Sequence, residues 1–277
     1  MAWPVLVFDI ESIPDAEGLR RTTEVPPGLD DAQVVEHWRA RRAEAGQGDF
    51  MPLHLQRVLA ISCVFRNAEG LRVHSLVDRD GQSEGRIVQQ FFQIIEKHSP
   101  QLVSWNGSGF DLPVLHYRGL IHGVVADKYW DLGDDDREFK WNNYISRYHM
   151  RHLDLMDLLA KYNGRANAPL DALAKLCGFP GKLGMDGSQV WPQYLAGQTD
   201  AIRQYCETDV LNTYLVYCRS QKMRGGLTED EYTQEIAMAR AKARWCRPSS
   251  TRSKSTTRSW SAGTAAASTC RCCTTAA

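Results

Sequence analysis

The stretch that decides the fold is VLVFDIES, residues 5–12. Residues 5–10 form a short apolar run with β-branched side chains, which predicts a β-strand. The acids Asp9 and Glu11 lie at the end of this run. Because side chains alternate along a strand, both carboxylates face one way, while Phe8 and Ile10 face the other. Charged groups at the end of an apolar strand are costly to bury unless they are paired or bind a metal.

The pair of acids at residues 9 and 11 is a candidate metal site. Two adjacent carboxylates repel each other, and a divalent cation removes that repulsion. Hard oxygen ligands favour Mg²⁺ or Mn²⁺ over zinc. The alternative is that Asp9 and Glu11 are ordinary solvent-facing residues at a strand end.

A third acid, Asp111, ends the segment WNGSGFD, residues 105–111. The pattern predicts a strand, a tight glycine turn and then the start of a helix. An Asp in the first helical turn is also an ordinary capping residue, so this motif alone decides nothing. It is not a dinucleotide-binding fingerprint, because Leu112 stands where the third glycine is needed.

The segment QYCETDV, residues 204–210, contributes Tyr205 and Asp209. Four residues apart on a predicted helix, their side chains share one face. The apolar neighbours of this pair indicate that the helix packs on the core, where a phenol and a carboxylate need partners. The alternative is a structural Tyr–Asp pair on a helix surface.

The remaining pattern predicts an α/β fold with a mixed sheet and flanking helices. Further strands are expected at residues 58–66, 71–77 and 102–105, the first two joined by a hairpin turn at 67–70. An amphipathic helix is expected at 83–98, with Ser83 capping its start. Other helices are expected at 31–45, 111–121, 154–162, 170–177, 199–219 and 228–245.

Composition describes an ordinary globular chain of 277 residues with a formal net charge of zero. The chain lacks the strongly basic balance of a wide nucleic-acid surface, although bound metals can supply local positive charge. The sequence predicts no membrane span and no signal peptide, so we expect a cytoplasmic protein. Cysteines 63, 177, 206 and 218 lie singly in apolar segments and are expected to be reduced.

From Pro248 onward the chain is dominated by Ser, Thr, Ala, Arg and Cys, with no acid and no apolar period. We expect three parts: a catalytic domain at residues 1–225, a C-terminal helix at 226–247, and a disordered or out-of-frame tail at 248–277. The tail cysteines Cys270, Cys272 and Cys273 have the wrong spacing for a zinc site.

Together the three acidic segments resemble the DEDD exonuclease superfamily, in its DEDDy branch. The residues of these motifs are most similar to those of the proofreading domain of family B DNA polymerases and of its stand-alone bacterial relatives. The likeness covers roughly residues 3–245 and extends to GMDGSQVW, residues 184–191. Any one motif is weak, and three in this order are a strong signal. The motifs show one small departure, Ser12, where many relatives have Thr; the hydroxyl is retained.

The resemblance implies a ribonuclease H-like fold and a 3′→5′ exonuclease that binds the 3′ end of a single strand of nucleic acid. It implies two divalent cations, Mg²⁺ or Mn²⁺, bound by Asp9, Glu11, Asp111 and Asp209, with Tyr205 orienting the attacking water. Protein partners are left open. Implied substrate contacts come from four residues: Ile10, Ser12, Asn106 and Phe110. For the last two, a turn-stabilising Asn and a core Phe are the competing interpretations.

Several charged residues are expected to lie outside the site. Asp154 and Asp157 are interpreted as helix-capping residues, and Lys182 as a solvated lysine rather than a phosphate contact. Arg39, Arg41 and Arg42 are interpreted as a solvated helix face. Two other functions stay open: an RNA-processing 3′→5′ exoribonuclease, which would use the same metal site, and a catalytically silent nucleic-acid-binding module.

Overall fold

The computed structural model describes residues 4–182 and 184–243. The expectations for the tail at 248–277, and for the last two residues of the helix predicted at 228–245, lie outside the described residues. Within those residues, no helix is long and apolar enough to cross a membrane. Cys63, Cys177, Cys206 and Cys218 are free thiols, as expected.

The core of the fold is one five-stranded sheet with the order β3-β2-β1-β4-β5. The central strand pairs antiparallel with β2 and parallel with β4, and β5 continues the parallel side. The strands are β1 (Val5–Pro14), β2 (Gln56–Asn67), β3 (Gly70–Val77), β4 (Gln101–Ser104) and β5 (His152–Asp154). This mixed sheet with flanking helices confirms the α/β, ribonuclease H-like fold that was expected.

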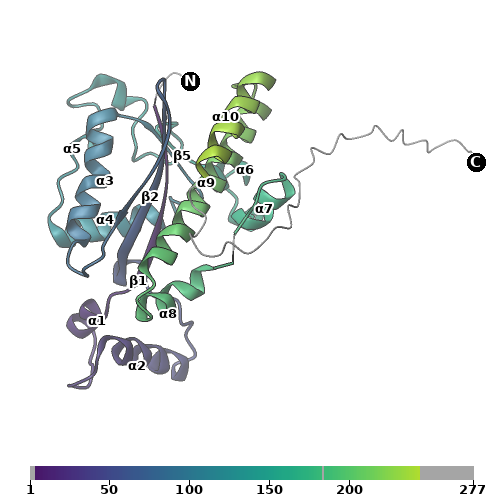
Figure 1. Cartoon of the computed structure of the whole chain (residues 1–277). Helices are drawn as coiled ribbons and strands as arrows, with labels where there is room; N and C mark the ends of the chain where they lie inside the picture. Colours follow the sequence, from purple (N-terminus) through teal and green to yellow (C-terminus); the bar gives the residue numbers. More distant parts are fainter. Residues whose placement is uncertain (1–3, 183, 244–277) are drawn as a thin grey trace, which may run out of the picture. The chain divides into compact units, whose positions relative to one another are not determined.

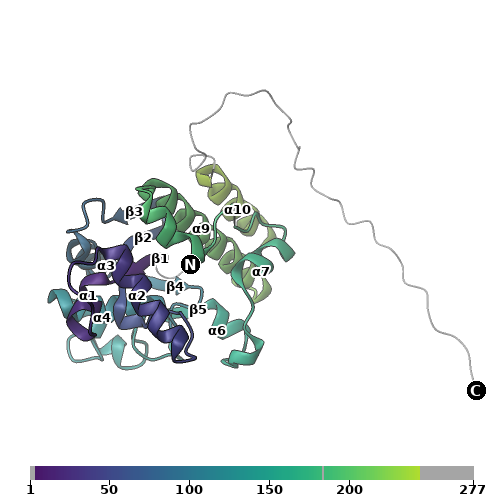
Figure 2. The same cartoon turned by 90° about the horizontal axis from the view of Figure 1, so that it is seen from below.

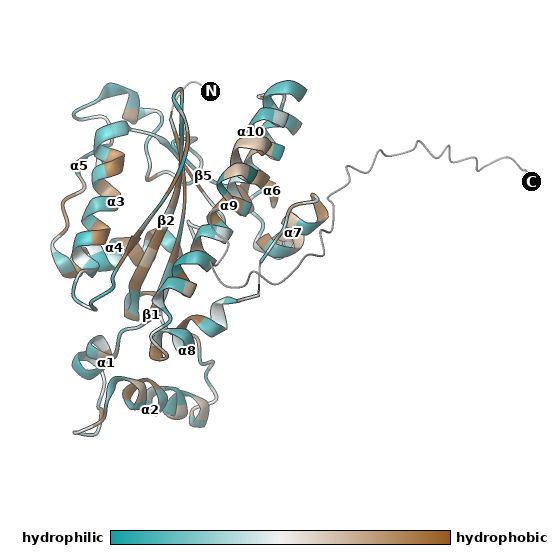
Figure 3. Cartoon of the chain, viewed as in Figure 1, coloured by the Kyte–Doolittle hydropathy of each residue, from teal (hydrophilic) through white to brown (hydrophobic). Residues whose placement is uncertain are grey.

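Helices cover both faces of the sheet (Figure 1). On one face, α3 (Glu84–His98) and α4 (Asp111–His122) pack on Leu6, Phe8 and Ile10. On the other face, α9 (Thr199–Met223) and α10 (Glu229–Ala243) pack on Val5 and Val7. The side chains of β1 therefore alternate as predicted, and Asp9 and Glu11 share the face that α9 covers. Figure 3 shows the apolar stripe of α3 turned toward the sheet.

Most expected helices are present within one or two residues of their predicted ends. The described elements not yet named are α1 (Ala16–Thr22), α2 (Asp31–Glu44), η1 (Leu53–Leu55), α5 (Asp127–Trp130), η2 (Arg137–Lys140), α6 (Leu155–Leu159), η3 (Gly164–Ala166), α7 (Leu170–Leu176), η4 (Gly187–Gln189) and α8 (Val190–Leu195). The sequence did not predict α1, α5, α8 or β5.

The helix predicted at 154–162 is shorter in the structure, where α6 spans Leu155–Leu159. Asp154 ends β5, and its side chain caps α6 by accepting the backbone N–H groups of Met156 and Asp157. The helix stops at Leu159, and Lys161 and Tyr162 then adopt left-handed backbone angles, with φ of 52° and 58°. A helix cannot continue through such residues.

The expected cap at Ser83 was also wrong in its detail. Ser83 is the N-cap residue of α3, but its side chain accepts no backbone hydrogen bond there. Its hydroxyl instead donates to the carboxylates of Asp78 and Asp80, at 2.7 and 3.0 Å. Acceptors this close attract the hydroxyl proton.

A small lobe lies beyond the end of β1, formed by α1, α2 and the loop that follows (Figures 1 and 2). It has its own apolar cluster, which includes Leu19, Val35, Trp38, Met51 and Leu55. Asp30 opens α2 with a reciprocal capping box to Gln33. The lobe therefore has a defined structure at the end of the sheet where the acidic residues of β1 lie.

Candidate active site

The first pair of acids lies where β1 loses its parallel neighbour. β4 pairs with β1 only over Val5–Val7, so the residues beyond have no strand on that side. Asp111, the first residue of α4, fills the gap: its Oδ1 accepts the backbone N–H of Ile10 at 3.0 Å. Asp111 is therefore bonded to the main chain of Ile10, the residue between Asp9 and Glu11.

The turn before Asp111 is tightly constrained. Asn106 has a left-handed backbone with φ of 66°, and Asp154 accepts the N–H groups of Asn106 and Ser108, both at 2.9 Å. A Cβ added at Gly107 would lie 2.2 Å from the Ser104 hydroxyl oxygen, closer than any real contact. The glycine in this motif is thus required by close approach to the end of β4.

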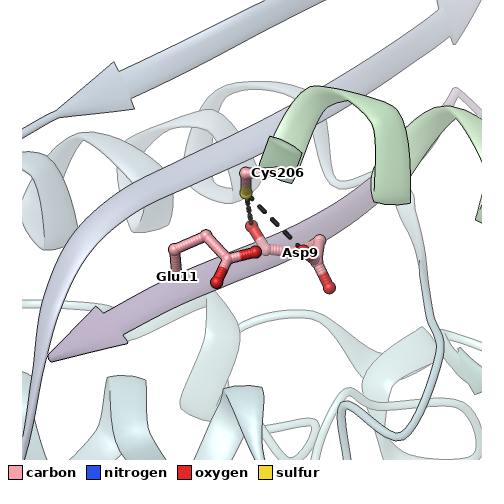
Figure 4. Close-up of side chains that lie close together, drawn as sticks. All are labelled: Asp9, Glu11 and Cys206. Atoms are coloured by element: carbon pink, nitrogen blue, oxygen red, sulfur yellow. Dashed lines mark hydrogen bonds between the residues drawn. The ribbon is translucent and has the colours of Figure 1, made fainter. Parts of the chain in front are cut away.

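Helix α9 brings the third motif to the same place. Cys206 donates its S–H to the backbone oxygen and to Oδ2 of Asp9, at 3.4 and 3.6 Å (Figure 4). One ligand atom each from Asp9, Glu11 and Cys206 lie within 4.8 Å of one another. The sequence analysis did not predict Cys206 at the site. Its place directly after Tyr205 in the third motif is the signal that could have indicated it.

Lys182 belongs to the site, which corrects the expectation of a solvated lysine. Its ammonium group donates to the hydroxyl of Tyr205 and lies 3.5 Å from Oδ2 of Asp209. Its main chain is held as well, because Asp171 accepts the Lys182 N–H at 2.6 Å. The sequence contained no signal for this contact, since Lys182 comes from a loop 23 residues before Tyr205.

Burial raises the pKa of each of these acids, and repulsion from the other site acids adds to the shift at Asp9 and Glu11. Burial raises the pKa of Asp9 well above its usual range, and the charges of Asp111, Glu11 and Asp209 raise it further. Burial has the same effect on the pKa of Glu11, which the nearby charge of Lys182 partly lowers. Four negative charges at one edge therefore disfavour their own ionisation.

The other two acids have additional causes. Burial raises the pKa of Asp111 to about 7, although the hydrogen bond from Ile10 opposes the shift. Burial also raises the pKa of Asp209, against the charge of Lys182 and the hydrogen bond from Tyr205. Burial raises the pKa of Tyr205 as well, so this phenol is neutral and acts as a hydrogen-bond donor.

A cation suits this set of oxygens. The Asp209 residue is 93% buried, and its Oδ1 has no hydrogen-bond partner among the described residues. Within the described part of the chain, the ion pair between Asp209 and Lys182 is the one that reaches these four carboxylates. A divalent cation would satisfy the unpaired oxygen and offset the remaining repulsion.

The four residues proposed for substrate contacts lie in different environments. The Ile10 side chain is buried and its N–H is engaged by Asp111, and the Ser12 hydroxyl donates to Gln56 at 3.0 Å. Asn106 and Phe110 are half-buried on the glycine turn. The ring of Phe110 packs against the core and also contacts Phe50.

The charged residues expected outside the site are found as follows. Asp154 caps α6, as predicted, whereas Asp157 accepts two hydrogen bonds from Arg147, both at 2.7 Å. Arg41 and Arg42 bond backbone oxygens of nearby loops. None of these contacts reaches the four acids.

A family model described as "Predicted 3'-5' exonuclease related to the exonuclease domain of PolB" matches residues 48–258. Asp111, Tyr205 and Asp209 lie inside the matched segment, and Asp9 and Glu11 precede it. No curated protein matches the sequence.

Solved structures of low sequence identity resemble the chain. The family B DNA polymerase of the archaeon Pyrobaculum calidifontis is 17% identical, with a TM-score of 0.49 over 80% of this chain and 25% of the polymerase. E. coli Exonuclease I in complex with an oligonucleotide is 12% identical, with a TM-score of 0.33 over 78% of this chain and 43% of that one. The chain spans about a quarter of the polymerase and less than half of Exonuclease I.

Proposed function

The chain belongs to the family of predicted 3′–5′ exonucleases related to the exonuclease domain of PolB, and we propose that it is a metal-dependent 3′→5′ exonuclease that releases nucleoside monophosphates. We favour DNA as the substrate. The observation that carries the proposal is the meeting of four carboxylates from three distant segments. One carboxylate, that of Asp209, has a buried oxygen with no partner in the part of the chain that the structure describes.

In this proposal Asp9, Glu11 and Asp209 would hold one divalent cation. Asp9 and Asp111 would hold a second. Two such cations supply stabilisation of both the attacking and the leaving oxygen of a phosphodiester. The oxygen-rich set of ligands favours Mg²⁺ or Mn²⁺.

Tyr205 is proposed to orient the attacking water. Its raised pKa excludes it as a general base, because a neutral phenol cannot accept the proton of water. Lys182 donates to the hydroxyl oxygen of Tyr205, so the hydroxyl proton can be donated either to Asp209, as in this structure, or to a water. Glu11 is the second proposed partner of the water, and Lys182 is a positioning residue.

Ile10, Ser12, Asn106 and Phe110 remain proposed substrate contacts. For Ile10 the side chain and N–H are already engaged, so a contact would use its backbone oxygen. The proposed organisation is a catalytic domain at 1–225, a helical segment at 226–247 that contains α10, and a separate tail at 248–277.

The test is digestion of 5′-labelled single-stranded DNA, duplex DNA and RNA by the purified chain with Mg²⁺. We expect a ladder that shortens from the 3′ end, fastest for single-stranded DNA, that stops with chelator and resumes with Mg²⁺ or Mn²⁺. Glu235→Gln is a matched control, because Glu235 is a buried acid that pairs with Arg66 away from the site. First products cut in mid-strand, or no cleavage by the folded chain, would contradict the proposal.

Two other outcomes have defined readings. Faster digestion of RNA than of DNA would assign the site to RNA processing. Binding of oligonucleotide without cleavage, and without heat exchange on titration with Mn²⁺, would indicate a silent binding module. The cytoplasmic location stays a prediction.

A further inference from the structure

An exposed aromatic ring, Phe50, stands beside the proposed catalytic site. Its side chain is 63% exposed, and its ring centre lies 6.3 Å from that of Phe110 at an interplanar angle of 60°. Phe110 directly precedes Asp111, whose carboxylate is bonded to β1. Phe50 therefore contacts Phe110, the residue directly before the proposed metal ligand Asp111.

The chain on both sides of Phe50 is anchored. The following residue, Met51, is buried in the apolar cluster of the small lobe, and its backbone oxygen accepts the Gln56 amide at 3.0 Å. Gln56 in turn accepts the hydroxyl of Ser12, the residue after Glu11 on β1, at 3.0 Å. On the preceding side, Arg42 of α2 donates to the backbone oxygen of Gly48 at 2.8 Å.

These contacts fix the position of the Phe50 loop relative to β1. The hydrogen bonds from Ser12 through Gln56 to Met51 connect the Phe50 loop to the strand that carries Asp9 and Glu11. The small lobe lies beyond the end of that strand (Figures 1 and 2). Single exposed apolar side chains are common and need no explanation, but this ring has anchored backbone on both sides and contacts Phe110 of the glycine turn.

We propose that Phe50 stacks on an unpaired base of the substrate strand, next to the nucleotide that Phe110 contacts. The inference rests on the proposed exonuclease function and names a determinant of its substrate class. Stacking on an aromatic ring tolerates any sequence, because every base has a π-face. A base inside a duplex has both faces covered by its neighbours, so the ring favours single-stranded ends.

The test measures binding apart from cleavage. Fluorescence anisotropy with a 5′-labelled deoxythymidine oligonucleotide is recorded with Ca²⁺ in place of Mg²⁺, for the parent chain, Phe50→Ala and Phe50→Trp. Loss of one stacked base is worth about 1–3 kcal/mol, so Phe50→Ala should bind roughly 5- to 150-fold more weakly. Phe50→Trp, which keeps a stacking face, should bind as tightly as the parent.

Trp141→Ala is the matched control. Trp141 is an exposed aromatic residue, at 77%, next to Asn142, whose backbone oxygen accepts Arg151 near the start of β4. This is the opposite end of β4 from the glycine turn. Its loss should leave the affinity for the oligonucleotide unchanged.

A second measurement uses Mg²⁺ and the p-nitrophenyl ester of thymidine 5′-monophosphate, which has no second base. Phe50→Ala should hydrolyse this ester as the parent does while its KM for the oligonucleotide rises. Equal oligonucleotide affinity for Phe50→Ala and a parent that binds and cleaves would overturn this inference alone. A parent that neither binds nor cleaves would overturn the proposed function, and this inference with it.

Discussion

Strand β1 and the residue that follows it carry buried acids in two contrasting settings. Just past the strand, Asp15 pairs with Arg118, which also binds Glu84 through two of its nitrogens. Glu84 further accepts His122 and the backbone N–H of Val58, both at 2.7 Å. Every carboxylate in this cluster has a donor.

Within the strand, Asp9 and Glu11 lie with Asp111 and Asp209, and among the described residues one ammonium, that of Lys182, pairs with a member of this set, Asp209. Both clusters are buried, yet one is neutralised by the protein and the other is left short of positive charge. The difference shows why a cation would bind at the second cluster and not at the first. Burying like charges side by side destabilises the fold locally, and a bound cation offsets that loss of free energy.

The largest expected effect is on activity. Asp9→Asn should lower the rate of hydrolysis on the order of 10³-fold or more, because the residue is proposed to hold both cations. The same change should raise the melting temperature of the metal-free protein, because it removes one of four repelling charges. Calorimetry in chelator and the labelled-strand assay measure the two effects. Full activity in this variant would contradict the site.

The next effect is on stability, in the neutralised cluster. Arg118→Met leaves Glu84 and Asp15 buried without their shared cation, which typically costs about 3–5 kcal/mol of unfolding free energy. Denaturant unfolding measures this loss. The control is Arg147→Met. The Arg147 side chain is half-exposed, so its ion pair with Asp157 should contribute about 1 kcal/mol or less to the free energy of unfolding. Equal losses in both variants would show that the first cluster is not held by charge pairing.

A smaller effect is expected at the one ammonium of the acidic cluster. Lys182→Met removes the donor to Tyr205, and loss of a single hydrogen bond should lower kcat about tenfold. It also removes a positive charge that competes with a cation, so Mn²⁺ should bind several-fold more tightly by isothermal titration. Lys182→Arg should keep the charge and restore weaker Mn²⁺ binding. An unchanged Mn²⁺ affinity in Lys182→Met would contradict its proximity to the metal ligands.

The smallest effect is the pH dependence of stabilisation by metal. The pKa of Asp111 is about 7 in the folded protein, against about 3.9 when unfolded, so its protonated form stabilises the metal-free fold at low pH. That contribution is lost as pH rises toward and through 7. Cations bind the ionised form, so saturating Mg²⁺ should raise the melting temperature by several degrees at pH 8 and by less at pH 5.

A buried histidine, His152, adds a pH dependence of stability that is the same with and without Mg²⁺. Burial lowers the pKa of His152 to about 4, so the unfolded chain binds its proton first and stability falls as pH drops from 6.5 to 4. This loss occurs with and without Mg²⁺ and cancels in the difference of melting temperatures. A Mg²⁺ shift that is equal at both pH values, or that persists in Asp9→Asn, would contradict the proposed site.

Much of the fold was predictable from local pattern. The hairpin of β2 and β3, the amphipathic α3 and the long α9 were predicted because their apolar periods and turn residues are local signals. The short elements α1, α5, α8 and β5 were missed because they owe their structure to packing. β5, for example, is three residues long and is defined by its pairing with β4.

The sequence by itself determined the alternation along β1, the common face of Tyr205 and Asp209, and the start of α4 at Asp111. Each follows from backbone geometry within a few residues. The tertiary structure alone decided that Asp111 bonds Ile10, that Lys182 turns toward Tyr205, and that Phe50 meets Phe110. The physical reason is that these contacts join segments whose separation carries no periodic signal, and chain folding over the edge of the sheet sets their distances.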